Sequence, residues 1–175
     1  MSASADPFDD DDAVIEPAET GSEHADSHPP KPANKRRQNR IAAMQMLYML
    51  EAAPSDDLRD AFFTFFNNLP QPREHYAFAE ELAEGAWENR SEVDAIIERH
   101  AQNWSLHRIA RVDLAILRLA IYELQFRLDI PPIVSINEAI DLSKVFSTPD
   151  SKRFINGILD RLKDTLHRPL RTAAI

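Results

Sequence analysis

The sequence has no cysteine and only three glycines in 175 residues. Without cysteine the chain cannot form disulfide bonds, a thiolate metal site or a thiol nucleophile. Glycine takes positive φ angles most readily, so three glycines provide poorly for β-hairpin turns and for phosphate-binding loops. The scarcity of glycine therefore favours a helical protein. The lack of cysteine also fits the reducing cytoplasm, where we expect the protein to act.

Long hydrophobic runs are also absent. Charged residues interrupt every apolar run well before 18 residues, so the sequence predicts no transmembrane helix and no membrane partner. The N-terminus is acidic from Asp6 onward and lacks the charged-then-apolar order of a signal peptide. With 43% hydrophobic residues, the chain can form one domain, or two small subdomains that share a core.

Charge is distributed unevenly along the chain. Residues 1–34 contain nine acidic residues and one lysine, which accounts for −8 of the formal net charge of −9. Such a polar segment cannot bury enough apolar surface to offset the entropy of ordering it. We therefore expect a disordered acidic tail over residues 1–34, a helical domain over residues 35–168 and a C-terminal tail over residues 169–175. The nearly neutral domain is free to carry a local basic patch.

Apolar residues recur at helical spacing in seven segments, which predicts an all-α fold. Prolines and polar caps mark their approximate limits. The expected helices cover residues 35–52, 56–69, 73–89, 91 to beyond 97, 109–127, 135–146 and 149–168. Gly85 lies inside the third of these helices, where glycine costs about 1 kcal/mol relative to alanine. A close helix–helix contact at Gly85 would explain its presence.

The segment from Val112 to Leu124 is apolar nearly all the way round. Only Asp113, Arg118 and Glu123 interrupt it. A helix that is apolar on every side is packed by neighbours on every side. We therefore expect this segment to be the central helix of the fold.

Three polar patterns predict helix starts. Ser91 with Asp94, and Ser135 with Glu138, have the spacing of capping boxes. Thr148 is followed by a proline, which is typical of an N-cap and the first helical position.

Catalytic signatures are absent from the sequence. The six histidines form no HxxxH pair, and there is no nucleophile elbow, P-loop or dinucleotide fingerprint. Asp113 and Glu123 lie on helix faces about 80° apart, which permits a paired acid and base. Solvated or ion-paired helix carboxylates are the ordinary alternative. We expect no enzyme, no catalytic residue, no cofactor and no metal site.

Five cations precede the first apolar stripe: Lys31, Lys35, Arg36, Arg37 and Arg40. Guanidinium groups bind phosphate oxygens bidentately and stack on bases, which suits single-stranded RNA. At about 100° per residue the arginines continue the apolar stripe. They must then project past the end of the bundle or belong to a segment that orders on binding. An ordinary basic helix start is the alternative, and cations are unfavourable at a helix N-terminus.

Three aromatic residues are candidates for stacking on RNA bases, namely Tyr48, Phe146 and Phe154. Phe154 lies at helical spacing with Ile158, so a core position is the alternative for Phe154. Tyr48 could be a core residue with its hydroxyl at the surface.

Three segments form a recognisable set: Arg111 through Leu124, Ile130-Pro131 through Ile136-Asn-Glu-Ala139, and Ser151 through Phe154-Ile-Asn-Gly-Ile-Leu-Asp160. Together they resemble the NusB family of bacterial transcription antitermination factors. The resemblance covers about residues 35–166, and the Ile-Asn-Glu-Ala and Phe-Ile-Asn-Gly pair is its most specific part. Other positions that fit the family are Arg37, Arg40, Gln45, Leu47, Tyr48, Gly85, Asn89, Asp94, Ile97 and Trp104.

The resemblance implies two packed helical subdomains around a long central helix. It also implies binding to the single-stranded boxA element of nascent ribosomal RNA leader transcripts, together with the ribosomal protein NusE, in the RNA polymerase antitermination complex. A homodimer is left open. Combined with the basic cluster, the analogy gives as expected RNA-binding residues Lys35, Arg36, Arg37, Arg40, Tyr48, Asp150 and Phe154. It gives Asp113 and Arg118 as residues that face or support the NusE partner.

Three residues depart from the family pattern. Ser147 replaces a usual glycine, Ala86 replaces a usual valine, and Asn39 stands where a small residue is common. These changes put the loop geometry before the last helix in question.

Two other interpretations stay open. The chain could be the RNA-recognition part of a ribosomal RNA methyltransferase, whose N-terminal domain has a similar fold but which needs a glycine-rich α/β domain after it. It could also be a protein-only scaffold in which the arginines are incidental. For the acidic tail, competition with RNA for the basic cluster is one hypothesis, and a solubilising leader is the other.

Overall fold

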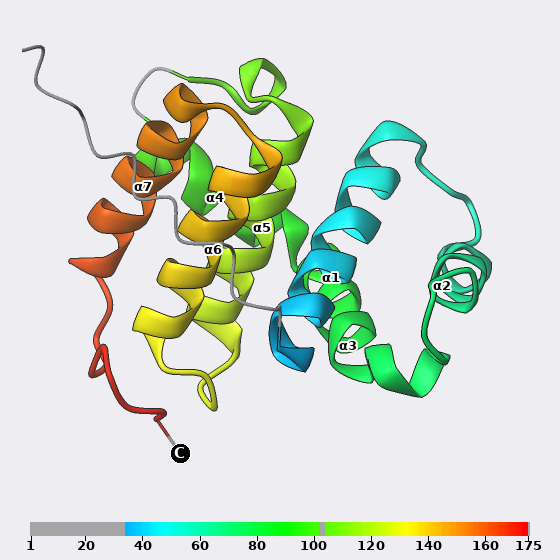
Figure 1. The fold of residues 1–175 in the computed structure, drawn as a ribbon. Coiled ribbons are helices and arrows are strands. Elements are labelled where there is room, and N and C mark those ends of the chain that lie inside the picture. Colours follow the sequence, from blue (N-terminus) through cyan, green and yellow to red (C-terminus); the bar gives the residue numbers. More distant parts are fainter. Residues whose placement is uncertain (1–33, 102–103, 175) are drawn as a thin grey trace, which may run out of the picture. The chain divides into compact units, whose positions relative to one another are not determined.

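A computed structural model of the chain describes residues 34–101 and 104–174. This part of the chain is all helical, with seven α-helices and two short 3-10 turns (Figure 1). The α-helices are α1 (Lys35–Ala52), α2 (Leu58–Asn67), α3 (Ala77–Glu88), α4 (Arg90–His100), α5 (Arg111–Phe126), α6 (Pro132–Phe146) and α7 (Pro149–Lys163). The 3-10 turns are Arg73–Tyr76 and Leu106–Arg108. The predicted all-α fold is confirmed, whereas the predicted acidic tail lies outside the described residues except for Asn34.

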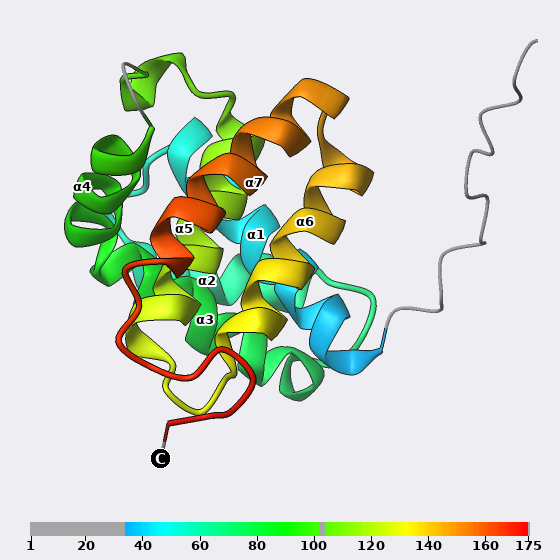
Figure 2. The same cartoon turned by 90° about the vertical axis from the view of Figure 1, so that its left-hand side faces the viewer.

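Helix α5 is the centre of the packing, as its sequence predicts. Every residue from Asp113 to Leu124 is buried. Helix α5 contacts α1, α3, α4, α6 and α7. In Figure 2, α7 crosses in front of α5, with α4 and α6 to either side. A helix surrounded in this way has no solvent face, which explains its nearly unbroken apolar sequence.

The other helices form two groups around α5. Helices α1 and α3 pack on each other and on α5, and α2 packs on the 3-10 turn before α3. Helices α6 and α7 likewise pack on each other and on α5. None of the helices among residues 34–101 and 104–174 has the length and hydropathy needed to cross a bilayer.

Most helix bounds lie within three residues of the prediction; the larger differences are the start of α3 and the end of α7, which is at Lys163 and not at residue 168. Helix α1 has the predicted limits, but α2 begins at Leu58, after the N-cap Asp57. The helix expected from Arg73 starts as a 3-10 turn and becomes α-helical at Ala77. The shifts of α2 and α3 lie at helix starts, where local hydrogen bonds compete with the regular helix.

Of the three predicted caps, only Thr148 is confirmed. Its Oγ1 accepts a hydrogen bond from the backbone N–H of Ser151 at 3.1 Å. The capping box at Ser135 is wrong, because α6 already begins at Pro132 and the Ser135 hydroxyl donates to Glu123 on α5.

The capping box at Ser91 is also wrong. Helix α4 begins one residue earlier, and its N-cap Asn89 makes no side-chain cap bond. The Asp94 carboxylate accepts two hydrogen bonds from Arg118 instead. In both failed boxes a buried charge on α5 attracts the side chain that would have capped the helix.

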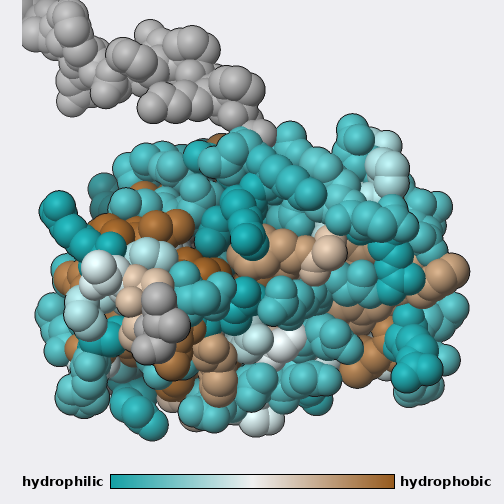
Figure 3. Space-filling view, turned by 90° about the horizontal axis from the view of Figure 1, so that it is seen from below, coloured by the Kyte–Doolittle hydropathy of each residue, from teal (hydrophilic) through white to brown (hydrophobic). Residues whose placement is uncertain are grey.

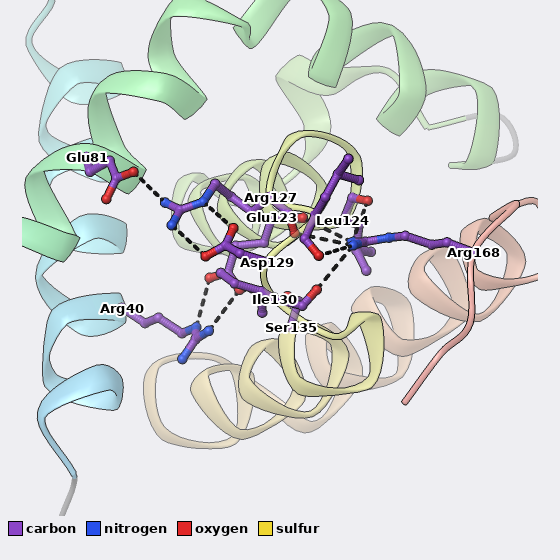
Figure 4. Close-up of polar contacts among 10 residues, drawn as sticks. Arg40, Glu81, Glu123, Leu124, Arg127, Asp129, Ile130, Ser135 and Arg168 are labelled. Atoms are coloured by element: carbon purple, nitrogen blue, oxygen red, sulfur yellow. Dashed lines mark hydrogen bonds and ion pairs between the residues drawn. The ribbon is translucent and has the colours of Figure 1, made fainter. Parts of the chain in front are cut away.

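The C-terminal residues expected as a tail pair with the loop that joins α5 to α6. The backbone N–H of Ile133 donates to the Leu170 carbonyl at 2.9 Å, and that of Ala174 donates to the Leu128 carbonyl at 2.8 Å. Arg168 donates to five backbone carbonyls at the end of α5, among them that of Leu124 at 2.9 Å (Figure 4). This segment therefore covers the C-terminal end of the central helix.

Gly85 makes the close contact that its position in α3 predicts. A Cβ atom built on Gly85 would lie 2.0 Å from the hydroxyl oxygen of Tyr122 on α5. The Tyr122 ring is buried and stacks on Phe126 with 5.4 Å between ring centroids. Glycine is required here because no side-chain atom fits between the helix and the ring.

We predict that Gly85→Ala lowers the free energy of unfolding by about 1–3 kcal/mol, because the buried Tyr122 ring must move. Gly157→Ala in α7 is the matched control, since a Cβ there has no neighbour within 4 Å. The control should gain about 0.5–1 kcal/mol from helix propensity. Urea unfolding followed by circular dichroism measures both values. Equal changes in the free energy of unfolding for the two substitutions would contradict the close contact between Gly85 and Tyr122.

Candidate nucleic-acid interface

The first turn of α1 presents three cations, Lys35, Arg36 and Arg37, which we call the basic arm. The Asn34 side chain caps this turn by accepting the backbone N–H of Arg37 at 2.9 Å. Lys35 and Arg36 are exposed. The Arg36 guanidinium lies 3.9 Å from the centroid of the Phe78 ring, which holds it without neutralising it. The arm is therefore helical and positively charged.

Among the described residues, Arg37 is the member of the arm that forms an ion pair with a carboxylate. Its Nη1 lies 3.2 Å from Oδ2 of Asp141 on α6. Burial alone would raise the pKa of Asp141, but the hydrogen bond and charge of Lys144, with the charge of Arg37, hold that pKa below its usual value. Asp141 thus stays ionised and joins the arm to α6.

Arg40 points into the molecule instead of extending the arm. Only 4% of Arg40 is exposed. Its Nε and Nη2 donate to the two carboxylate oxygens of Glu123 at 2.8 and 2.9 Å (Figure 4). The Ser135 hydroxyl donates to the same carboxylate at 2.6 Å. The three residues come from α1, α5 and α6, and we call them the buried triad.

The buried triad corrects one expectation about the arginines. The helical geometry correctly places Arg40 on the apolar stripe, but the inference that it projects past the end of the bundle is wrong. The carboxylate of Glu123 compensates its charge inside the core, which is the condition under which a guanidinium can be buried. Glu123 is accordingly an ion-paired helix acid, the ordinary alternative to an acid–base pair.

Asp113 is buried and accepts a hydrogen bond from the hydroxyl of Ser147. Ser147 has an extended backbone, with φ of −134° and ψ of −170°, so a glycine is not needed there. The hydroxyl that this chain has gained ties the loop between α6 and α7 to α5. The departure at Ser147 therefore leaves the start of α7 well anchored.

Arg118 is also buried and joins three helices. It donates to both oxygens of Asp94 on α4, at 2.7 and 2.9 Å, and to Glu51 on α1 at 2.7 Å. Burial acts to lower the pKa of Arg118, but the hydrogen bonds to the two carboxylates act to raise it. The pKa of Arg118 is therefore above its usual value. Arg118 and Asp113 thus serve internal contacts first, and a direct contact with a partner stays a prediction.

A second candidate region lies where α7 begins. Asp150 is exposed and pairs with Arg153. Phe154 lies 5.8 Å from Trp104, centroid to centroid, and the Arg108 guanidinium lies 5.0 Å from the Trp104 ring. These side chains line a cavity of about 260 Å³, which we call the aromatic pocket. Asp113 forms part of its wall.

Sequence reasoning did not single out Trp104 and Arg108 as candidate binding residues. Trp104 is 47% exposed, which is unusual for a residue of its size. The available signal was a tryptophan in a polar stretch between two helices, with an arginine four residues later. Phe146, in contrast, packs against the core.

Tyr48 lies on the same side of α1 as Arg37, because eleven residues correspond to about three full turns. Its side chain is exposed, so the expected core position is wrong. Helix α6 joins the two candidate regions, because it binds Arg37 through Asp141 and packs on α7. Within residues 34–101 and 104–174, no three histidine or carboxylate side chains are grouped closely enough to hold a metal ion.

A family model described as the NusB family matches residues 37–164. The chain belongs to the NusB family. A relative named transcription antitermination protein NusB, from Myxococcus xanthus, is 43% identical over 137 residues, which are 77% of this chain and 98% of the relative. Another of that name, from Geobacter sulfurreducens, is 46% identical over 131 residues, which are 75% of this chain and 95% of the relative.

Solved NusB structures share the fold. A structure of T. maritima NusB superimposes with a TM-score of 0.68 and 34% identity, over 82% of this chain and 96% of that one. A crystal structure of the antitermination factors NusB and NusE in complex with dsRNA gives a TM-score of 0.65 and 26% identity, over 74% of this chain and 96% of that one.

Proposed function

We propose that this NusB-family chain is a transcription antitermination factor. It binds boxA-type single-stranded RNA in nascent ribosomal RNA transcripts with the ribosomal protein NusE, in the RNA polymerase antitermination complex. Membership of the family and the name of its relatives support this function. The complex of NusB and NusE with RNA supports the choice of ligands. Such a factor acts where RNA is transcribed, which is the cytoplasm.

The basic arm is the proposed contact for RNA phosphates. Among the described residues the Lys35 side chain has no partner, and the Arg36 guanidinium contacts only the Phe78 ring, although its charge also acts on Asp129. Both charges are therefore available to phosphate oxygens. Arg37 is held by Asp141 at a part-exposed site and can exchange this carboxylate for a phosphate. Arg40 is buried and contributes to RNA binding indirectly, because its pairing with Glu123 fixes the helix that carries the arm.

The aromatic pocket is the proposed site for an unpaired base. Its volume of about 260 Å³ and its Trp104 and Phe154 walls suit a planar ring. Carboxylates of Asp113 and Asp150 line the same pocket and can accept hydrogen bonds from base amino groups. Tyr48, on the face of α1 that carries Arg37, is a further place for stacking. Base contacts of this kind would add sequence preference to the electrostatic attraction of the arm.

Asp113 and Arg118 are proposed to support the NusE partner indirectly. Arg118 holds α4 and α1 against α5, and Asp113 holds the loop before α7. The surface formed by these helices would keep its shape in the absence of the partner. We also propose that the protein is a binding protein and not an enzyme, because its buried Asp113, Arg118 and Glu123 are engaged in structural bonds.

We predict that boxA RNA binds with higher affinity than a scrambled strand of equal length, and that NusE increases the difference. Neutralisation of about three phosphates by the arm gives a slope of log K against log salt of about −2. Arg36→Ala with Lys35→Ala should reduce this slope by about 1.4, and Arg59→Ala, an exposed arginine on α2, should leave it unchanged. Fluorescence anisotropy titrations measure the affinities.

Two outcomes would contradict the proposal. Equal affinity for boxA and scrambled RNA, with and without NusE, would contradict the proposed antitermination function. If the salt dependence of RNA binding were unchanged in the arm variant, the arm would not bind phosphates, and a protein-only scaffold would be the remaining interpretation. A boxA duplex serves as a third ligand, since single-stranded RNA is the proposed form.

Trp104→Ala should weaken RNA binding by about 1–3 kcal/mol, the range for loss of one base stack. Phe63→Ala is the matched control, because Phe63 on α2 is 54% exposed and lies outside the aromatic pocket. The measurement is the same titration at one salt concentration. If the two variants bind RNA equally, the aromatic pocket is not part of the interface.

A further inference from the structure

One cavity among the described residues lies away from the basic arm and the aromatic pocket. It has a volume of about 550 Å³, is open to solvent and is lined by α4, the end of α5 and the segment from Leu162 to Arg168. None of its lining residues belongs to the arm or to the aromatic pocket. Its volume falls in the range of sites for small organic ligands, roughly 300–1,000 Å³.

The lining combines apolar and cationic side chains. Ile96, Leu124, Leu128, Leu162 and Leu166 supply apolar surface. The ionisable groups that face the cavity are Glu92, Arg99, His100, His167 and Arg168. With neutral imidazoles the lining has one more positive than negative charge. On the face shown in Figure 3, too, apolar patches lie among hydrophilic side chains, so a mixed surface is not confined to this cavity.

Two of these cations form no ion pair with a carboxylate among the described residues, although the charge of Asp129 acts on Arg168. Arg99 makes no hydrogen bond or ion pair there. Arg168 donates only to neutral backbone carbonyls (Figure 4). The single carboxylate of the lining, Glu92, lies seven residues before Arg99 on α4, which corresponds to about 10 Å along the helix.

One end of the cavity is distinctly positive. Arg161 donates to the carbonyl of His100 at 2.7 Å, which brings its guanidinium beside His100. Burial lowers the pKa of His100, and the charges of Arg99 and Arg161 lower it further. No carboxylate contributes to that shift. The imidazole therefore lies in a positive potential that a bound anion would relieve.

We propose that this cavity binds a small organic phosphate of mononucleotide size. The phosphate lies at the Arg99 and His100 end, and the body of the ligand covers the apolar surface toward Leu128. A phosphate monoester carries a charge of about −1.5 to −2 near neutral pH, which is opposite in sign to Arg99 and to the Arg161 guanidinium bonded to the His100 carbonyl. Guanidinium groups bind phosphate with paired hydrogen bonds, and an unpaired Arg99 has these donors free. The site is separate from the proposed RNA interface.

The test is isothermal titration calorimetry of the full chain with AMP, inorganic phosphate and adenosine at pH 7. AMP should bind at one site with a Kd below about 1 mM, and each of the two fragments at least about tenfold more weakly. Arg99→Ala should weaken AMP binding about tenfold or more. Arg59→Ala removes the same charge from α2 and should have no effect.

A second pair of variants tests the site without removing a cation. Ala95 is exposed, lines the cavity and lies four residues before Arg99. Ala95→Glu can pair with Arg99 within the helix and repel phosphate, so AMP binding should be lost. Ala95→Gln has nearly the same volume and no charge, and should retain most of the affinity. Neither change disturbs a buried side chain.

Nuclear magnetic resonance gives an independent result. Bound AMP should raise the pKa of His100, because the anion favours the protonated imidazole. Saturating boxA RNA should not displace AMP. The proposal is overturned if AMP shows no saturable binding up to about 10 mM, or if inorganic phosphate binds as tightly as AMP. Loss of AMP on addition of RNA, or equal binding by the Ala95 variants, would also overturn it.

Discussion

The buried pairing of Arg40 with Glu123 is the interaction on which the rest of the structure depends. It joins α1 to the central helix, and the hydroxyl of Ser135 adds α6 to the same carboxylate. Burying a guanidinium or a carboxylate alone is costly, so each charge requires the other in place. The pairing therefore fixes how α1 lies against α5 and α6. The position of the basic arm follows, because the arm is the first turn of that helix.

The cations of the domain divide into two groups with different tasks. Arg40 and Arg118 are buried, and each is bound to carboxylates from other helices. Arg127 similarly contacts Asp129 and Glu81, and it holds the pKa of Asp129 below its usual value mainly through a hydrogen bond (Figure 4). Lys35 and Arg36 remain outside such pairs. The buried arginines are not available for phosphates, so the number of cations in the sequence overestimates the number of RNA contacts.

Features encoded by neighbouring residues could be predicted from the sequence. The limits of α1, the central position of α5, the Thr148 cap and the close contact at Gly85 all follow from local patterns. The failures involve partners far apart in the chain. Arg40 and Glu123 are separated by 83 positions, so periodicity showed that Arg40 faces the core but could not show its carboxylate. The pairing of Trp104 with Phe154 could not be predicted either, because only the fold brings the two rings together.

The most direct test of this account is a double-mutant cycle on Arg40 and Glu123, with Arg40→Met, Glu123→Met and the double variant. Urea unfolding measures the free energy of each protein. Each single substitution should cost about 3–5 kcal/mol, because the remaining charge is buried without a partner. The double variant should regain at least about 2 kcal/mol relative to the sum of the two losses. Strictly additive losses would contradict the central role of this pair.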